Sequence, residues 1–468
     1  MAINYIEMRL EDCMDAIIDY RGKTPKKVDN GIPLITAKII KNGRIQEVSE
    51  FIAIDDYDNW MVRGLPLEGD VVLTTEAPLG EVAQLDARKV ALAQRVITLR
   101  GKKGTLENDY LLYLLQSSFV QNQLDGRASG STVTGIKQSE LREIILRLPP
   151  TALQKSISHQ LKCLDKKIDL NNKINQTLEQ MSQTLFKSWF VDFDPVIDNA
   201  LDAGNSIPEA LQSRAELRQK VRNSADFKPL PADIRALFPA EFEETELGWV
   251  PKDWDIVKTE DIAIKIGMGP FGSNIKASQF VSSGIPIING QQLKGFILED
   301  NFINYITDEH ANILKNSLVY EHDIVLTHRG TLGQVSLIPK RKGNEKFVIS
   351  QSQFYLRVDR KKCSPFYMIH FLKSKIGQEA LLSNASQVGV PSIARPSTHL
   401  KKITFINPPL SLHKLFDNEF EVILEKFMNC KEQSLALTAL RDTLLPKLIS
   451  GELSLENLPN LANQTEPA

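Results

Sequence analysis

The sequence is poor in cysteine and has no long apolar run. Its four cysteines are Cys13, Cys163, Cys363 and Cys430, and no two of them have CxxC spacing. This scatter argues against a disulfide framework and a cysteine zinc site, and it predicts free thiols in a reducing cytoplasm. No run of about 18 apolar residues and no basic segment leading into an apolar one is present, so we expect neither a membrane span nor a signal peptide.

The sequence also lacks the common signatures of catalysis. It contains no GxxxxGK[ST] phosphate loop, no HExxH metal motif and no GxSxG nucleophile elbow, and its 7 histidines are dispersed. Residues 267–272 do match GxGxxG, but Pro270 stands in the turn and no helical pattern follows. A Gly-rich loop after a strand is therefore favoured over a dinucleotide site. These absences predict a chain with no catalytic residue and no metal site of its own.

Residues 407–410 read Asn-Pro-Pro-Leu, which resembles the Asn-Pro-Pro-aromatic motif of adenine-N6 methyltransferases. In that motif the Asn holds the flipped amine and the aromatic ring stacks on the base, which Leu410 cannot do. No cofactor-binding Gly-rich strand and turn accompanies the motif. We favour an extended segment that delivers the chain into a long helix. A stand-alone methyltransferase that uses Asn407 is the alternative.

The formal net charge of −2 is unevenly distributed along the chain. Counting Lys and Arg against Asp and Glu, residues 256–410 carry +8, residues 1–150 carry −2 and residues 192–246 carry −6. A basic region of this size is a fair electrostatic footprint for DNA phosphates. The distribution therefore favours nucleic-acid binding by the second half of the chain, although basic domains also bind acidic proteins.

An internal repeat organises the chain. The offset between matched segments is 253 residues at first and grows to 259, which implies a few loop insertions in the second copy. The matched pairs are 32–35 with 285–288, 70–73 with 323–326, Gly80 with Gly333, and 148–150 with 407–409.

After each Pro-Pro the repeat continues into a long helical pattern. Apolar residues spaced by three and four indicate a coiled-coil seam, interrupted in the first copy by Asn171 and Asn175. Pro446 is expected to kink or end the second helix near its last turn. The two helices are predicted to pair antiparallel, with packing of each helix on its own domain as the alternative. The predicted helix-pairing residues are Ile157, Leu161, Leu164, Ile168, Leu178, Met181 and Leu185 in the first helix, and Phe416, Phe420, Ile423, Phe427, Leu437, Leu440 and Leu444 in the second.

The predicted fold is α+β, with two globular domains in a pseudo-twofold repeat separated by two long antiparallel coiled-coil helices. Within the first domain we expect a strand over 70–73 and one amphipathic helix over 109–123. The predicted boundaries are 1–150 for the first domain, 151–191 for the first long helix, 192–246 for a linker with a short helix near 208–223, 247–409 for the second domain, 410–453 for the second long helix, and 454–468 for a polar tail.

Several stretches resemble one known family, the specificity subunit of type I restriction–modification systems. They are Leu-Arg-Asp-Thr-Leu-Leu-Pro-Lys-Leu-Ile-Ser-Gly-Glu-Leu at 440–453, Leu-Phe-Lys-Ser-Trp-Phe-Val-Asp-Phe-Asp-Pro at 185–195, Glu-Leu-Gly-Trp-Val-Pro at 246–251 with Trp254, and Gly-Pro-Phe-Gly-Ser at 269–273. The resemblance covers nearly the whole chain. The family's plan is two target-recognition domains separated by two helical conserved regions, which matches the repeat.

The resemblance implies a non-catalytic, cytoplasmic, DNA-binding subunit of a restriction system. Each target-recognition domain would read one half of a bipartite double-stranded DNA site. The helices would set the spacer and dock methyltransferase subunits, two being expected, and restriction and translocase subunits would join. The whole complex would be a type I site-specific deoxyribonuclease and an adenine-N6 methyltransferase. S-adenosylmethionine would belong to the methyltransferase, ATP and Mg to the nuclease, and no cofactor to this chain.

Polar and basic side chains in predicted loops are the candidates for contact with base edges and phosphates. An adaptor that binds only proteins is the alternative if none of them meets DNA. The candidates are Lys23, Lys38, Lys41, Arg44, Arg127, Ser129 and Lys137 in the first half, and Lys276, Gln291, Gln292, Lys294, His328, Arg329, Gln351, Gln353 and Arg395 in the second.

Overall fold

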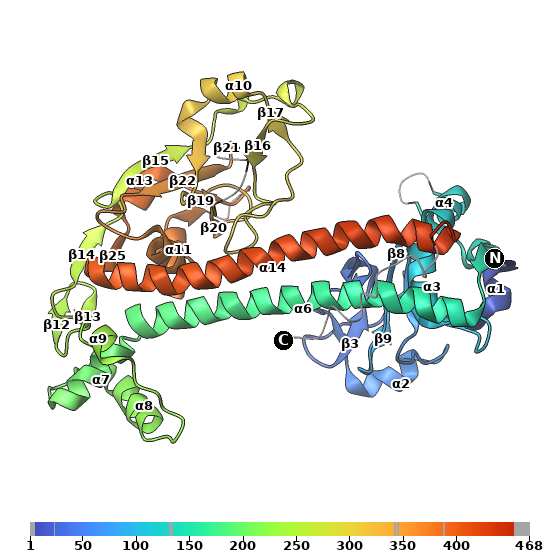
Figure 1. Cartoon of the computed structure of the whole chain (residues 1–468), viewed down its shortest axis with the longest axis horizontal. Helices are drawn as coiled ribbons and strands as arrows, with labels where there is room; N and C mark the ends of the chain where they lie inside the picture. Colours follow the sequence, from blue (N-terminus) through green and yellow to red (C-terminus); the bar gives the residue numbers. More distant parts are fainter. Residues whose placement is uncertain are drawn as a thin grey trace. The chain divides into compact units, whose positions relative to one another are not determined.

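The chain divides into two compact units in a computed structural model that describes residues 5–22, 24–130, 134–340, 343, 346–386 and 389–453, apart from the side chain of residue 273. Unit 1 consists of residues 1–173 and 430–468, and unit 2 of residues 174–429. The long helices α6 (Thr151–Phe190) and α14 (Leu410–Ser450) contribute one part to each unit (Figure 1). No helix within the described residues is long and apolar enough to cross a membrane.

Unit 1 is built on a four-stranded antiparallel sheet in the order β2-β10-β7-β8. Strand β7 is buried along its whole length, as expected for its run of Val, Leu and Thr. The strands of this sheet are β2 (Met14–Asp19), β10 (Val96–Gly101), β7 (Val71–Thr75) and β8 (Leu79–Gln84). A smaller sheet consists of β6 (Phe51–Ile52), β3 (Ile32–Ile35) and β9 (Ala91–Leu92), and β1 (Ile6–Arg9) pairs with β11 (Ile145–Leu148).

Unit 2 repeats this plan. Its main sheet has the order β15-β22-β19-β20, from β15 (Ala263–Met268), β22 (Gln353–Val358), β19 (Ile324–Thr327) and β20 (Val335–Leu337). The smaller sheet consists of β17 (Tyr305–Ile306), β16 (Ile285–Ile288), β21 (Lys346–Ile349) and β18 (Leu318–Tyr320), and β14 (Asp255–Lys258) pairs with β25 (Thr404–Asn407). The internal repeat in the sequence is therefore a repeat of strand order.

A pair of short helices follows the main sheet in each unit. The single helix predicted over 109–123 is two helices, α3 (Asn108–Gln116) and α4 (Ser118–Arg127). The reason is Ser117, whose side chain accepts a hydrogen bond from the backbone N–H of Val120 and so caps a new helix. In unit 2, Ser374 separates α11 (Pro365–Lys373) from α12 (Lys375–Leu382) in the same way. The next helices are α5 (Gln138–Arg142) and α13 (Pro396–Lys402).

Within unit 1, α6 and α14 run antiparallel and join through both apolar and polar contacts. Of the residues predicted for this seam, Ile157, Leu161, Leu164, Ile168 and Leu444 are buried, and Leu437 is partly buried. The buried amide of Asn171 donates to Gln433 Oε1 over 2.9 Å, which links the two helices at the interruption in the seam.

Leu440 differs from the prediction, because its side chain is exposed. The stripe on α14 advances by four residues from Leu437, so Arg441 faces α6 and its guanidinium lies 2.8 Å from Asp165. Leu440 is thereby rotated away from the seam. Helix α14 also continues four residues beyond Pro446, to Ser450. Of the two outcomes predicted for this proline, a kink or the end of the helix, the second is therefore wrong.

Within unit 2 the two helices meet through aromatic residues. Phe186 packs against Phe416, with ring centroids 5.9 Å apart, and Phe420 is buried in the same cluster. Leu178 is buried, whereas Leu185, Ile423 and Phe427 are partly buried at the edge of that core. Met181 is an exception at 54% exposed, because the stripe advances by four residues from Leu178 and places Ser182 in the interior.

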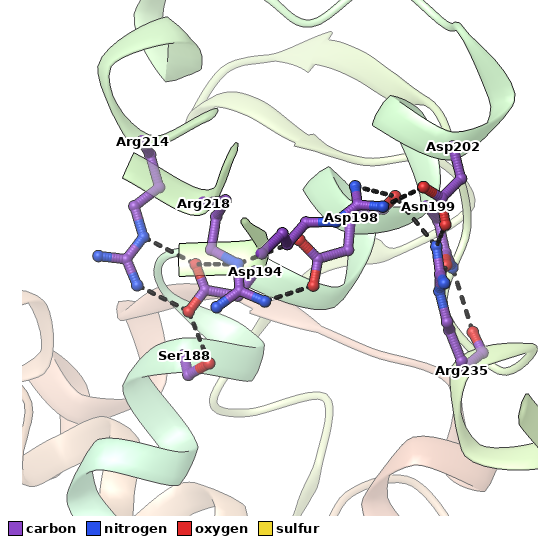
Figure 2. Close-up of polar contacts among 9 residues, drawn as sticks. Ser188, Asp194, Asp198, Asn199, Asp202, Arg214, Arg218 and Arg235 are labelled. Atoms are coloured by element: carbon purple, nitrogen blue, oxygen red, sulfur yellow. Dashed lines mark hydrogen bonds and ion pairs between the residues drawn. The ribbon is translucent and has the colours of Figure 1, made fainter. Parts of the chain in front are cut away.

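The segment between α6 and the second domain is helical where the sequence suggests one short helix. It contains α7 (Asp194–Ala203), α8 (Gln212–Arg222) and α9 (Ala232–Arg235), followed by the hairpin β12 (Phe242–Thr245) and β13 (Gly248–Pro251). Carboxylates on α7 meet guanidinium groups on α8 at a constant separation of 20 residues (Figure 2). The pairs are Asp194 with Arg214, Asp198 with Arg218, and Asp202 with Arg222. Arg235 of α9 binds Asp202 and Asn199, so the three helices form one ion-paired body.

Candidate nucleic-acid interface

One end of the main sheet gathers several loops in each unit. In unit 1 the end of β2, the turn from β7 to β8, and the start of β10 meet there, as the pairings Ile97 with Asp19, Val96 with Thr74, and Thr75 with Leu79 require. In unit 2 the matching pairings are Met268 with Phe354, Thr327 with Gln353, and Leu326 with Val335. We call these the loop edge of unit 1 and the loop edge of unit 2.

A further loop, which follows α4 or α12, completes each loop edge. In unit 1 the backbone N–H of Ile136 donates to Thr75 O over 3.0 Å, and Glu76 bridges Gly135. In unit 2 the N–H of Ile393 donates to His328 O over 2.9 Å, and Arg329 bridges Ser392. The two edges are therefore built by the same contacts, made 253 to 257 residues apart in the chain.

The loop edge of unit 2 brings together four of the predicted contact residues. His328 Nε2 lies 3.1 Å from the backbone oxygen of Gln351, and burial lowers the pKa of His328, so this imidazole is neutral at pH 7. Arg329 and the side chain of Gln351 are exposed, which leaves one cationic fork and one amide on the surface. Gln353 lies beneath them at 1% exposed, beside Thr327 and Ser350.

The Gly-rich segment over 267–272 shapes this edge by close packing. A Cβ on Gly269 would lie 1.9 Å from Ser350 O, and a Cβ on Gly267 would lie 2.3 Å from the ring of Tyr355. Both glycines are therefore needed because the chain passes tightly against β22. The segment ends strand β15 and enters a loop, as the sequence favoured, and Phe271 at its tip is 83% exposed.

Of the other candidates of unit 2, Gln291, Gln292 and Lys294 lie on another loop, whereas Arg395 ends the loop after α12, directly before α13. Lys276, Gln291, Lys294 and Arg395 are exposed. Gln292 is fully buried instead, because its amide donates to Asn301 O over 2.8 Å and accepts from the N–H of Asn289. Gln292 and Gln353 are thus interior groups that hold loops in place, a role that their sequence positions did not suggest.

In unit 1 the candidates divide between surface and internal contacts. Lys38, Lys41 and Lys137 are exposed, and Lys23 lies outside the described residues. Arg44 faces α6 and pairs with Asp165 at 3.2 Å and Asp169 at 2.5 Å, so it binds the domain to the helix. Arg127 pairs with Glu140 at 3.4 Å, and the backbone of Ser129 pairs with Gly135.

Three residues of this edge were missed by reasoning from the sequence. Arg95 Nε lies 2.6 Å from Glu76, with both side chains partly exposed, and Arg21 donates to Ile136 O over 2.9 Å. The signal for Glu76 was present in the repeat, because the offset of 253 matches it to Arg329, which was a candidate. Arg21 and Arg95 become recognisable only when the ends of β2 and β10 are placed beside β7.

The Asn-Pro-Pro segment lies at the end of β25, where the side chain of Asn407 is engaged in local contacts. Its Oδ1 lies 2.9 Å from His413 Nε2, and its Nδ2 donates to Lys362 O over 3.3 Å. These contacts fit a segment that anchors the start of α14. Within the described residues, no group of three or more His, Cys, Asp or Glu is arranged to hold a metal ion.

Two copies of an α+β domain, each with an edge of exposed polar loops and each joined to a long helix, define a repeat protein with two matching loop edges. The family model of the type I restriction modification DNA specificity domain matches residues 4–180 and 251–433. The chain therefore belongs to the family of type I restriction–modification DNA specificity proteins.

Individual relatives agree with this assignment. The chain is 26% identical over 361 residues to the type I restriction enzyme HindI specificity subunit of Haemophilus influenzae, which covers 74% of this chain and 76% of that protein. It is 25% identical over 399 residues to the MjaIX specificity subunit of Methanocaldococcus jannaschii, covering 84% and 79%. Among solved structures, a type I restriction–modification S subunit from M. genitalium has the same fold, with a TM-score of 0.50 at 14% identity and 96% of each chain covered.

Proposed function

We propose that this chain is the non-catalytic DNA specificity subunit of a type I restriction–modification complex, and that each unit reads one half of a bipartite site. The observation that carries the proposal is the recurrence of one loop edge in both units with different side chains on it. Two identical edges would suit a palindrome, whereas two different edges on one chain suit two different half-sites. The charge of +8 over residues 256–410 favours phosphate contact by unit 2.

The paired helices would act as the spacer and as the docking frame for methyltransferase subunits. Both domains are attached to the same two helices, so the distance between the half-sites would follow from helix length. Apolar side chains remain exposed on the helices in both units, and such positions suit protein partners. They are Leu170, Leu435 and Leu440 in unit 1, and Met181, Leu410 and Val422 in unit 2.

The chemistry would reside in the partner subunits. A methyltransferase docked on each unit would bind S-adenosylmethionine and methylate adenine, and restriction and translocase subunits would bind ATP and Mg. This chain would contribute position and sequence choice alone.

Methylome sequencing of a strain that carries the intact system tests the proposal. We expect adenine methylation in a motif of two defined parts separated by a fixed gap. Replacing residues 256–405 with those of a relative should change one part of the motif and leave the other, and an unchanged motif would contradict the proposal. Methyl transfer by the isolated chain that is lost on Asn407→Ala would instead support a methyltransferase. Absence of DNA binding by the complex at low salt would support an adaptor for proteins.

A further inference from the structure

Glu76 and Arg329 hold the same position in the two loop edges. They lie between two matched pairs, Asp70 with Asp323 and Gly80 with Gly333, all at an offset of 253 with no insertion between them. Glu76 is the first residue after β7, and Arg329 is the second residue after β19. Each forms a β-bridge with the loop that follows the short helices, Glu76 with Gly135 and Arg329 with Ser392. The two edges therefore present opposite charges at one structurally matched point.

The residue that lies beside Glu76 in unit 1, Arg95, also differs from its counterpart in unit 2. Arg95 stands directly before β10 and pairs with Glu76 at 2.6 Å. The strand pairings match Val96 with Gln353, so the counterpart of Arg95 is Ser352. Unit 2 thus has an uncharged serine in place of Arg95 and an arginine, Arg329, in place of Glu76. Among the residues that the structure describes, Arg329 makes no ion pair, and its guanidinium remains exposed.

The two groups have complementary hydrogen-bonding abilities. A carboxylate only accepts, and Glu76 keeps 39% of its side chain exposed while Arg95 fixes its direction. Phosphates repel such a carboxylate, so its presence on an edge with Lys137 and Arg95 calls for a specific donor on the DNA. An arginine only donates, and its fork matches the O6 and N7 atoms of guanine in the major groove.

We propose that Glu76 accepts a hydrogen bond from the exocyclic amine of a cytosine or adenine in one half-site, and that Arg329 donates to a guanine in the other. This assignment rests on the proposed function, because it requires that the loop edges face DNA. It adds a residue outside the predicted contact set, Glu76, and it ties one base class to each half-site.

The test compares methylomes of strains carrying the wild-type system, Glu76→Gln or Arg329→Lys. Gln adds a donor to the acceptor without a large change in shape, and Lys keeps the charge but loses the fork. We expect Glu76→Gln to relax selectivity at one cytosine or adenine position of one half-site, and the identity of that base separates the two amines. Arg329→Lys should relax selectivity at one guanine of the other half-site. Two charge-neutralising controls away from the loop edges, Glu7→Gln on β1 and Lys401→Gln on α13, should leave every position unchanged.

A binding measurement covers the case in which a variant no longer methylates. The assembled complex is titrated with duplexes that carry each single base change in the wild-type motif, and with one that carries 7-deazaguanine at the assigned position. Loss of N7 should weaken wild-type binding on the order of tenfold and Arg329→Lys binding much less. The assignment would be overturned if both variants discriminated between bases as the wild type does, or if both variants changed the same half-site. The proposed function would still stand in either case, provided that the wild-type motif has two parts. Absence of a two-part motif in the wild type would overturn both.

Discussion

Arg441 Nη1 of α14 lies 2.8 Å from Asp165 Oδ1 of α6, inside unit 1. The other carboxylate oxygen accepts from the hydroxyl of Tyr113 over 2.7 Å, and Arg44 reaches the same carboxylate at 3.2 Å. One aspartate thus holds together the two long helices, helix α3 and the hairpin of β4 (Ile40–Lys41) and β5 (Arg44–Ile45).

Asp165→Asn should destabilise unit 1 by about 2 kcal/mol, because it removes the charged partner of Arg441 on α6 and leaves this largely buried guanidinium with the exposed Asp442. Denaturant unfolding of the purified subunit measures the change. Asp169→Asn is the matched control: Asp169 is 45% exposed and its ion pair with Arg44 lies near the surface, so we expect about 1 kcal/mol or less. Equal decreases in the free energy of unfolding for the two variants would show that Asp165 contributes no more to stability than Asp169.

Arg218→Met should destabilise unit 2 by about 3 kcal/mol, because Asp198 would remain nearly buried without its cation. Arg222→Met removes the next pair of the same ladder, where Asp202 is 43% exposed, and should cost about 1 kcal/mol or less. Thermal unfolding of both variants gives the comparison. A larger effect for Arg222 would contradict the weight assigned to burial.

His370 should make unit 2 sensitive to acid. Burial lowers the pKa of His370 to about 3, so below its ordinary value of 6.5 the unfolded chain takes up a proton that the folded chain refuses. Stability is therefore lost as the pH falls from about 6.5. His370→Phe, in a site already lined by Phe186 and Phe416, should reduce this loss by about 2 kcal/mol at pH 5. Urea unfolding at pH 5 and pH 8 measures it, and parallel pH profiles for the two proteins would refute the assignment.

Asp417 should act with the opposite sign. Burial raises the pKa of Asp417 from 3.8 to about 6, so between these values the folded chain holds a proton that the unfolded chain releases. Its contribution to stability is present below about pH 4 and is lost as the pH rises through 6. Asp417→Asn should therefore stabilise the protein at pH 8 by roughly 2 kcal/mol and have little effect near pH 4. Glu419→Gln, at an exposed position of the same helix, should leave the stability unchanged at both pH 8 and pH 4.

Gly269→Ala should impair DNA recognition through the loop edge of unit 2. The new methyl group would collide with a backbone oxygen, and displacing the backbone costs about 1–3 kcal/mol. Gly272→Ala is milder, because its Cβ meets only the side chain of Gln351, at 2.9 Å, and that side chain can move. Titration of the assembled complex with its DNA site measures both variants. Similar affinities for Gly269→Ala and the wild type would argue against a role for this loop.

The long helices were predictable to within a few residues at both ends, because Pro-Pro pairs precede them and the apolar spacing continues for forty residues. The phase within each helix was harder to predict. Met181 and Leu440 have the right chemistry for a seam, but Ser182 and Arg441 occupy it. The hydroxyl of Ser182 donates to Glu179 O of its own helix, and Arg441 pairs with Asp165 of α6. Apolar spacing alone does not report such partners.

The sequence predicts that polar residues in loops of both halves form the candidate interface. It does not predict which of these loops meet at one end of each sheet. Arg44 looked like a surface residue until its partner Asp165, 121 residues further along the chain, was placed beside it. Glu76 is acidic, whereas the predicted contact residues are basic or polar and uncharged, although the repeat aligns Glu76 with Arg329. Sheet order decides which loops meet, and strands that are adjacent in unit 1, such as β2 and β10, are distant in sequence.

The division of the chain into units has a consequence for its synthesis. Unit 2 is one continuous segment, residues 174–429, and is complete as soon as residue 429 has left the ribosome. Unit 1 needs Leu444, Leu445 and Leu448 to cover its core, so the domain made first must wait for the part made last. During that delay the apolar face of the nascent first domain is open to chaperones and to misassembly with other chains. A nascent chain arrested when residue 429 has just left the ribosome should therefore protect residues 174–429 from protease while residues 1–173 are still cleaved.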